Sequence, residues 1–267
     1  EFSSSDGGDS TAKAQMAKNQ TLFRARHGAY LRKKLTPDPG HVAIARSAGP
    51  ASLRVLYIDD RIPRKHFGAG FPRSNDVVRS LVAAGARVTV LPYNFPFEGQ
   101  DEGHAGDIPR TVELMYGSGR HNVREFMQDR ADSFDVIWIS RPHNMMHFAD
   151  QDFSWGASRP VLVYDAEAFF ALRDIQKALI QGQALREQEK RSLLEKEAAL
   201  VSRADHVIAV SEAERQGIRD CASEHVRSVT VIAHQVAAKP SPALFEERND
   251  FLFIGNLDYC DAPNADS

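Results

Sequence analysis

Seven short, mostly apolar segments, each separated from the next by polar or helix-forming sequence, constrain the fold of this chain more than any other feature. They predict strands at 54–58, 87–91, 113–116, 135–140, 160–164, 206–210 and 228–232. Continuous apolar runs of this kind are typical of strands that helices cover on both faces of a parallel sheet. The intervening sequence predicts helices at 74–84, 122–130, 168–203 with a break near Gly182, and 212–222. We therefore expect an α/β fold with a doubly wound, mostly parallel sheet.

The loops that follow strands are the candidate functional site, because ligands of doubly wound sheets bind beyond the carboxyl ends of the strands. The first such loop opens with two carboxylates, Asp59 and Asp60, directly after a strand. Such a pair could bind the metal of a phosphorylatable receiver domain, or it could line a site for a sugar or a nucleotide. The rest of the sequence has to decide between these two interpretations.

Neither a receiver domain nor a hydride-transfer enzyme fits the sequence well. A receiver needs a phosphoacceptor aspartate at the end of its third strand, but Ser140 stands there in "DVIWISRP", and no lysine closely follows "VLVYDAE". A dinucleotide site needs G-x-G-x-x-G straight after the first strand, whereas Gly68 and Gly70 come well after it and no third glycine follows. The two glycines suit a loop whose backbone approaches a ligand ahead of a helix, or a plain turn.

Charge and composition narrow the possible partners. The formal net charge of −3 gives no support for binding to nucleic acid. The two cysteines, Cys221 and Cys260, form no ligand pattern, so we expect no metal site and a reducing, cytoplasmic location. One segment, "TLFRARHGAYLRKKL" (21–35), is basic and has some apolar content. It predicts either a solvated helix packed on the main domain or a peripheral contact with an anionic membrane surface, at the inner face of the membrane.

Several segments together resemble a known enzyme family. "YIDDRIPRKHFGAGFPRSNDVVRSLVAAGARVTVLPYN" is similar to the family's opening strand, glycine loop, helix and second strand. "FDVIWISRPHN", "VLVYDAEAFFALRD" and "EAALVSRADHVIAVSEAER" are similar to later segments, and "FLFIGNLDYCDAPNADS" looks like the start of a second domain. The family is that of the retaining GT-B glycosyltransferases that include many bacterial polysaccharide enzymes, and the chain resembles their N-terminal, acceptor-side half.

This resemblance implies a domain organisation and an activity. It implies a leader with a basic helical segment at 1–50, a Rossmann-like GT-B N-terminal domain at 51–248, and the start of a truncated donor-binding domain at 249–267. The activity would be transfer of a sugar from a nucleotide-sugar donor to a saccharide or lipid-linked acceptor in polysaccharide biosynthesis, with retained configuration and no cofactor. Residues 1–267 by themselves would be inactive. The alternative is a non-catalytic α/β module that binds a sugar or a nucleotide.

The resemblance also implies roles for individual residues. His143 and Asp165 would be catalytic: His143 would hydrogen-bond the transferred sugar, and Asp165 would contact acceptor hydroxyl groups. The implied substrate-binding residues are Asp59, Asp60, Arg61, Gly68, Gly70, Glu167 and Arg173. For Arg173 an ion pair with Asp165 or Glu167 is an equal alternative, and for His143 a structural role.

One motif match is set aside. Glu187 with Glu195, and Glu189 with Glu197, have the E-x7-E spacing found at the nucleotide-sugar site of retaining glycosyltransferases. Here the spacing falls in a charge-dense helix with oppositely charged residues four apart, which is typical of a solvated helix face. For Glu197 we expect a structural role in helix packing.

Overall fold

The computed structural model describes residues 9–32, 53–68, 70–102, 106–155, 158–222, 228–235 and 244–250, together with the single residues 34, 38, 42 and 45. The chain divides into two units, residues 1–234 and 235–267. The second unit contributes only the short 3-10 helix η6 (Phe245–Glu247) to the description. The strand expected in "FLFIGNL" lies outside the described residues. The predicted donor-domain start at 249–267 stays a prediction.

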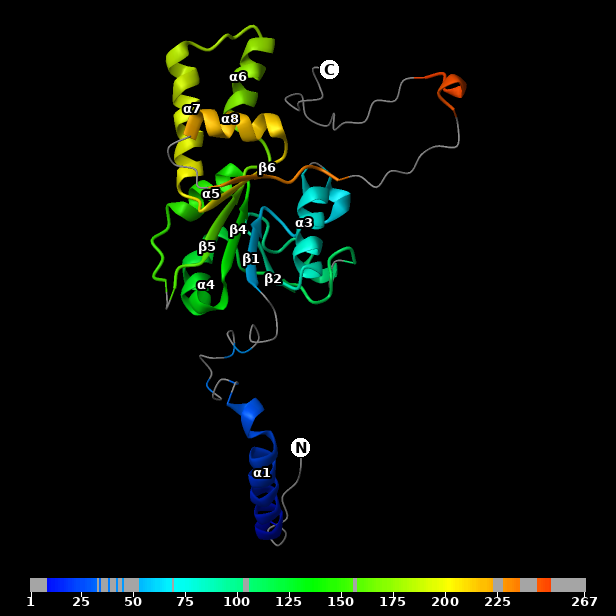
Figure 1. The fold of residues 1–267 in the computed structure, drawn as a ribbon, viewed down its shortest axis with the longest axis vertical. Coiled ribbons are helices and arrows are strands. Elements are labelled where there is room, and N and C mark those ends of the chain that lie inside the picture. Colours follow the sequence, from blue (N-terminus) through cyan, green and yellow to red (C-terminus); the bar gives the residue numbers. More distant parts are fainter. Residues whose placement is uncertain are drawn as a thin grey trace. The chain divides into compact units, whose positions relative to one another are not determined.

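The centre of the first unit is a parallel sheet of seven strands (Figure 1). The strands are β1 (Arg54–Asp59), β2 (Arg87–Pro92), β3 (Glu113–Leu114), β4 (Val136–Ser140), β5 (Val161–Asp165), β6 (His206–Ala209) and β7 (Val229–Val231). Their order is β3-β2-β1-β4-β5-β6-β7, and every neighbouring pair is parallel. The predicted α/β class and all seven predicted strands are confirmed. The order reverses between β1 and β4, which is where doubly wound sheets bind their ligands.

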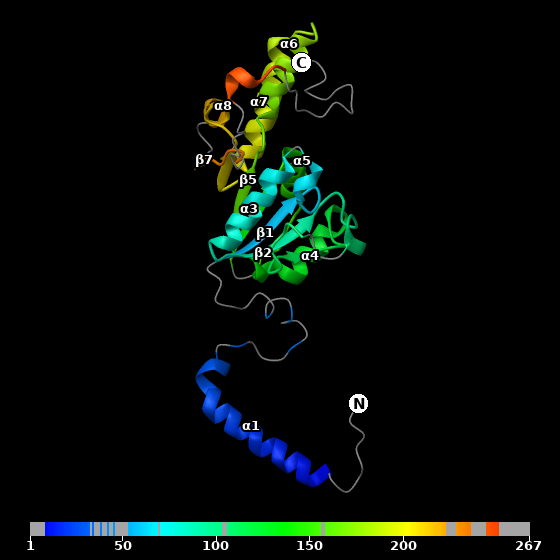
Figure 2. The same cartoon turned by 90° about the vertical axis from the view of Figure 1, so that its right-hand side faces the viewer.

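Helices cover both faces of this sheet. They are α3 (Phe71–Ala83), α4 (Val123–Arg130), α5 (Pro142–Ala149), α6 (Phe170–Ile180), α7 (Glu187–Ser202) and α8 (Glu212–Ala222). Successive residues of β1 point to opposite faces. Val55 and Tyr57 share a core with α3, while Leu56 and Ile58 share the other core with α4, α5, α7 and α8. Figure 2 shows α3 alongside β1 on its face of the sheet. Burial on both faces explains why the strands read as continuous apolar runs.

Two details differ from, or refine, the predicted elements. The segment "PHNMMHFA", which lies in none of the predicted helices, forms α5, with Pro142 in its first turn, where a missing N–H costs nothing. The predicted break in 168–203 is confirmed, since α6 ends at Ile180 and Gly182 has φ 68° before α7 begins. Helix α5 follows β4 and helix α6 follows β5. The N-terminus of each helix therefore faces the carboxyl edge of the sheet.

The N-terminal helix α1 (Asp9–Leu31) contains most of the basic segment predicted at 21–35. Its backbone departs from helical geometry at His27, next to Gly28. None of the helices in the described part of the chain is both long enough and apolar enough to span a bilayer. Contact of this segment with a membrane surface stays a prediction.

Candidate functional site

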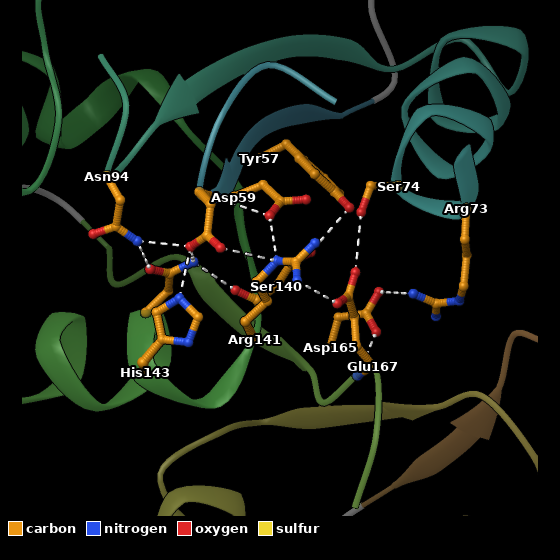
Figure 3. A network of polar contacts seen from close by, with 12 residues as sticks. Tyr57, Asp59, Arg73, Ser74, Asn94, Ser140, Arg141, His143, Asp165 and Glu167 are labelled. Carbon is orange, nitrogen blue, oxygen red and sulfur yellow. Dashed lines mark hydrogen bonds and ion pairs between the residues drawn. The ribbon is translucent and has the colours of Figure 1, made fainter. Parts of the chain in front are cut away.

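Polar side chains from four strand ends and from α3 form one network at the carboxyl edge of the sheet, beside the reversal of strand order (Figure 3). Its members are Asp59, Asp60, Arg73, Ser74, Asn94, Ser140, Arg141, His143, Asn144, Asp165 and Glu167. Figure 3 shows His143 and Asn94 at one end of the network, Arg73 at the other and Arg141 between them. Five residues predicted from the sequence therefore come together: Asp59, Asp60, His143, Asp165 and Glu167.

Arg141, which directly follows β4, is the centre of this network. Its Nε donates to Asp59 Oδ1 at 2.8 Å and lies 3.4 Å from Asp60 Oδ2, and its Nη1 lies 3.1 Å from Glu167 Oε2. Burial acts to lower the pKa of Arg141, but the carboxylates of Asp59 and Glu167 outweigh it and raise that pKa. One guanidinium group thus joins carboxylates that follow two different strands, β1 and β5.

Arg141 and Glu167 share an unusual backbone conformation. They have φ values of 79° and 55°, and they are the two non-glycine residues with positive φ in the described part of the chain. Such conformations cost about 1–3 kcal/mol each and concentrate at functional sites. Because the two residues follow neighbouring strands, β4 and β5, and form an ion pair with each other, the strain is located within the network itself.

Gly70 makes room for the Glu167 carboxylate. A Cβ atom at Gly70 would lie 2.6 Å from Glu167 Oε1, closer than any side chain can approach. The Oγ of Ser74, in the first turn of α3, donates to the same oxygen at 3.3 Å. The sequence predicts that Gly68 and Gly70 approach a ligand, whereas here the group that reaches Gly70 is the chain's own carboxylate, and Gly68 lies exposed beside it.

Burial raises the pKa of the Glu167 carboxyl to about 7, with a smaller upward contribution from Asp59 and a partly compensating one from Arg141. A carboxyl group with a pKa near the working pH can both hold and release a proton. Glu167 is therefore an acid of the network whose charge changes near neutral pH.

His143 and Asp60 form a hydrogen-bonded pair at the other end of the network. Asp60 Oδ1 accepts from His143 Nε2 at 2.6 Å and from the amides of Asn94 and Asn144 at 2.6 and 2.9 Å. Burial alone would raise the pKa of Asp60, but the bond from His143 and the charge of Arg141 lower it to about 2. Ionised Asp60 can only accept, so the shared hydrogen belongs to His143 Nε2. In the neutral tautomer that carries this hydrogen, Nδ1 is an acceptor, on a side chain that is 48% exposed.

Asp165 lies beneath this surface and is paired with Arg73. Arg73 Nη1 lies 3.0 Å from Asp165 Oδ2, and the two side chains are 2% and 0% exposed. Trp138 Nε1 donates to the same oxygen at 3.2 Å, and Arg73 Nε donates to the carbonyl of Ile232 at 2.9 Å. Burial raises the pKa of Asp165, and the ion pair with Arg73 opposes that rise. The expected contact of Asp165 with acceptor hydroxyl groups does not fit this burial. The residue instead holds Arg73 in place through the buried ion pair.

Arg61 and Arg173 lie apart from the network that the sequence assigns them to. Arg61 pairs with Glu98 at 2.9 Å, and its guanidinium lies 4.2 Å from the ring centroid of Phe95. It therefore ties the loop after β1 to the loop after β2. Arg173 is exposed on α6, with its guanidinium 5.3 Å from the ring of Phe170.

The ion pairs proposed for Arg173 are made by two other arginines, Arg73 with Asp165 and Arg141 with Glu167. Sequence reasoning missed both. Arg141 could have been predicted as a site residue by the argument used for Asp59 and Asp60, because it directly follows a strand. Arg73 follows the glycine loop, and only its contact with Asp165, far away in the sequence, identifies it as part of the site. Across the described residues, no three His, Cys, Asp or Glu side chains are placed to hold a metal ion.

The E-x7-E segment was interpreted as a solvated helix face, and this is wrong for Glu197 of α7, which is buried. Glu195 is solvated, with a side chain 64% exposed and paired with Arg191, but Glu197 is only 6% exposed and accepts from the hydroxyl of Tyr164 at 3.4 Å. Burial raises the pKa of Glu197 to about 7. The expected structural role in helix packing fits this position.

This pKa predicts a pH dependence of stability. A raised carboxyl pKa in the folded state stabilises the protein below the unfolded-state pKa of about 4.3, and the contribution is lost as the pH rises through about 7. We expect Glu197→Gln to reduce the loss of unfolding free energy between pH 5 and pH 7.5, measured by urea denaturation. The control Glu195→Gln should leave that loss as in the wild type. An unchanged pH dependence in Glu197→Gln would contradict the prediction.

Comparisons with known proteins were made for the whole chain. No family model matches it, and neither does any curated protein sequence. Among solved structures it is similar to sucrose-phosphate synthase from Thermosynechococcus elongatus, with a TM-score of 0.40, 13% identity and coverage of 68% of this chain. It is also similar to UGT73P12 of Glycyrrhiza uralensis, with a TM-score of 0.36, 10% identity and coverage of 66% of this chain. The matched region spans 48% of each of those chains. Likeness at this distance leaves the function to be argued from the site.

Proposed function

We propose that this chain is the acceptor-side domain of a glycosyltransferase and that its polar network binds a sugar hydroxyl group close to the reaction centre. The observation that carries the proposal is the His143–Asp60 pair, which presents a half-exposed imidazole at the reversal of strand order. An ionised aspartate that holds a histidine in one tautomer is a common way to orient a hydroxyl group for reaction. The sequence segments that resemble GT-B glycosyltransferases point in the same direction.

In this proposal the chain provides binding and orientation. An acceptor hydroxyl attacks the anomeric carbon of a nucleotide-sugar, a new C–O bond forms, the bond from that carbon to the diphosphate breaks, and the hydroxyl proton passes to the leaving diphosphate. His143 Nδ1 accepts a hydrogen bond from a sugar hydroxyl, and Glu167 can exchange a proton near neutral pH. The leaving diphosphate would be stabilised by the donor-binding domain that the sequence resemblance implies. The setting would be polysaccharide biosynthesis, with a saccharide or lipid-linked acceptor and retained configuration.

A second candidate function is a binding module without turnover. It is favoured by the charges of the network, because both of its guanidinium groups, on Arg73 and Arg141, are already paired with carboxylates. Within the described residues of the network, each guanidinium group thus already has a carboxylate partner, and the Nη2 atom that each leaves without a hydrogen bond is buried. The two candidates differ in whether a second domain completes the site.

A transfer assay separates these candidates. We expect residues 1–267 to show no sugar transfer with a panel of nucleotide-sugars and saccharide acceptors, followed by mass spectrometry, because donor and acceptor are brought together only between two domains. We expect transfer from the product of the longest open reading frame that contains this chain. Turnover by residues 1–267 alone would disprove the need for a second domain, and no transfer by the longer product would favour the binding module.

A further inference from the structure

Two residues with exposed apolar side chains, Phe95 and Met146, are linked to the His143–Asp60 pair through the backbone. Phe95 is 45% exposed, and its backbone N–H donates to the carbonyl of Asp60 at 2.9 Å. Met146 is 51% exposed and lies three residues after His143 on α5, so the two side chains are neighbours on the helix surface. Asp60 is therefore hydrogen-bonded to the backbone of one residue with an exposed apolar side chain, and His143 shares its helix surface with another.

These two apolar side chains are positioned by the network itself. Asn94, directly before Phe95, donates to Asp60 and also to the side chain of Asn144 at 2.9 Å. The ring of Phe95 is held over the guanidinium of Arg61, which is itself paired with Glu98. The loop after β2, which contains Phe95, and the start of α5, which contains His143 and Met146, are thus fixed to each other through polar contacts.

The charges of the network disfavour an anionic ligand at the same place. Its four carboxylates, Asp59, Asp60, Asp165 and Glu167, outnumber its two guanidinium groups, and each guanidinium already pairs with a carboxylate. The start of α3, where an anion would be favoured by the N-terminal end of a helix, is taken by the Glu167 carboxylate. A phosphate or carboxylate placed here would meet like charge.

From the polar pair, the apolar flanks and the engaged cations together, we infer that the acceptor is an uncharged glycoside with an apolar aglycone. A sugar hydroxyl binds to His143 while the aglycone lies against Phe95 and Met146. The inference rests on the proposed function and narrows it, since it selects an acceptor with an apolar group over a free or phosphorylated saccharide. Buried apolar area then adds to the affinity that the hydroxyl contacts provide.

The test measures binding of methyl and hexyl β-glycosides of glucose, galactose and mannose to residues 1–267 by isothermal titration calorimetry. Hexyl glycosides are used below the concentration at which they form micelles. For the sugar that binds best, we expect the hexyl glycoside to bind about tenfold more tightly than the methyl glycoside, which corresponds to about 1.4 kcal/mol. The 6-phosphate of the same sugar should bind no more tightly than the free sugar.

Matched variants assign the effect to the two side chains. Phe95→Ala and Met146→Ala should each reduce the hexyl advantage and leave methyl glycoside binding nearly unchanged. The controls Phe245→Ala and Met16→Ala change side chains of the same types that are 82% and 70% exposed elsewhere in the chain, and should keep the full advantage. The Met146 variant keeps the test valid if Phe95→Ala disturbs its loop.

Three results would overturn the inference: equal affinity for hexyl and methyl glycosides, an advantage that survives in both variants, or tighter binding of the phosphorylated sugar. Each of these is distinct from failure of the proposed function, which the transfer assay decides. Binding of methyl glycosides that depends on His143 but gains nothing from the hexyl group would refute the apolar aglycone and leave the glycosyltransferase proposal standing.

Discussion

Replacing Arg73 by alanine is expected to lower the free energy of unfolding by about 3–5 kcal/mol, the usual cost of removing one partner from a buried ion pair. The loss is large because Asp165, with a fully buried side chain, would keep its charge without a partner or have to take up a proton. The measurement is urea denaturation followed by circular dichroism at neutral pH.

The sequence offers a matched control in Arg173, which like Arg73 lies in the first turn of a helix, shortly after a phenylalanine. Because Arg173 is exposed, Arg173→Ala should change stability by no more than about 0.5 kcal/mol. The double variant Arg73→Met with Asp165→Leu should recover much of the loss, since a buried ion pair can often be replaced by apolar residues of similar volume. Equal effects of Arg73→Ala and Arg173→Ala would refute the assignment of the buried ion pair.

Replacing His143 by alanine is expected to lower sugar transfer by about ten- to a thousandfold in the product of the longest open reading frame that contains this chain, because one oriented hydrogen bond at the reaction centre is lost. Folding should be preserved, since the side chain is half-exposed. The measurement is kcat/KM together with thermal unfolding of the same samples.

His206→Ala is the control for this substitution. His206 is exposed and begins β6, at the opposite end of the strands from the network, and its loss should leave activity unchanged. Asp60→Asn should lower activity in the same direction as His143→Ala, because the imidazole loses its ionised partner. Wild-type turnover in His143→Ala would leave the histidine with a structural role only.

The fold could be predicted because each strand carries its own signal. A run such as 54–58 is apolar on both faces, so burial between two layers of helices is encoded locally. The site could be located for a similar reason, since the carboxyl ends of parallel strands meet at one edge of the sheet. This rule predicted Asp59, Asp60 and Glu167 as site residues, because each lies at or just after the end of a strand. The short helix α5 was missed because its residues, after Pro142, show no long helical period.

The pairing within the site could not be predicted, since it depends on residues far apart in the chain. Arg73 and Asp165 are 92 residues apart, and nothing local distinguishes Arg73 from Arg173 as the partner. Burial of Glu197 is equally hard to predict, because its helix carries many charged residues and only the packing of α7 against its neighbours shows which of them faces inward. Strand ends indicate which residues can meet, while tertiary contacts decide which of them pair.

The left-handed turns at Arg141 and Glu167 have a consequence for anyone who transplants this network into another parallel sheet. Copying the side chains would be insufficient, because the two backbones must also enter conformations that a regular scaffold avoids. Glycine at either position would relax its turn and remove the ion pair between them. A screen that selects grafted designs for thermal resistance alone would therefore accept such glycines and discard the constellation it was meant to keep.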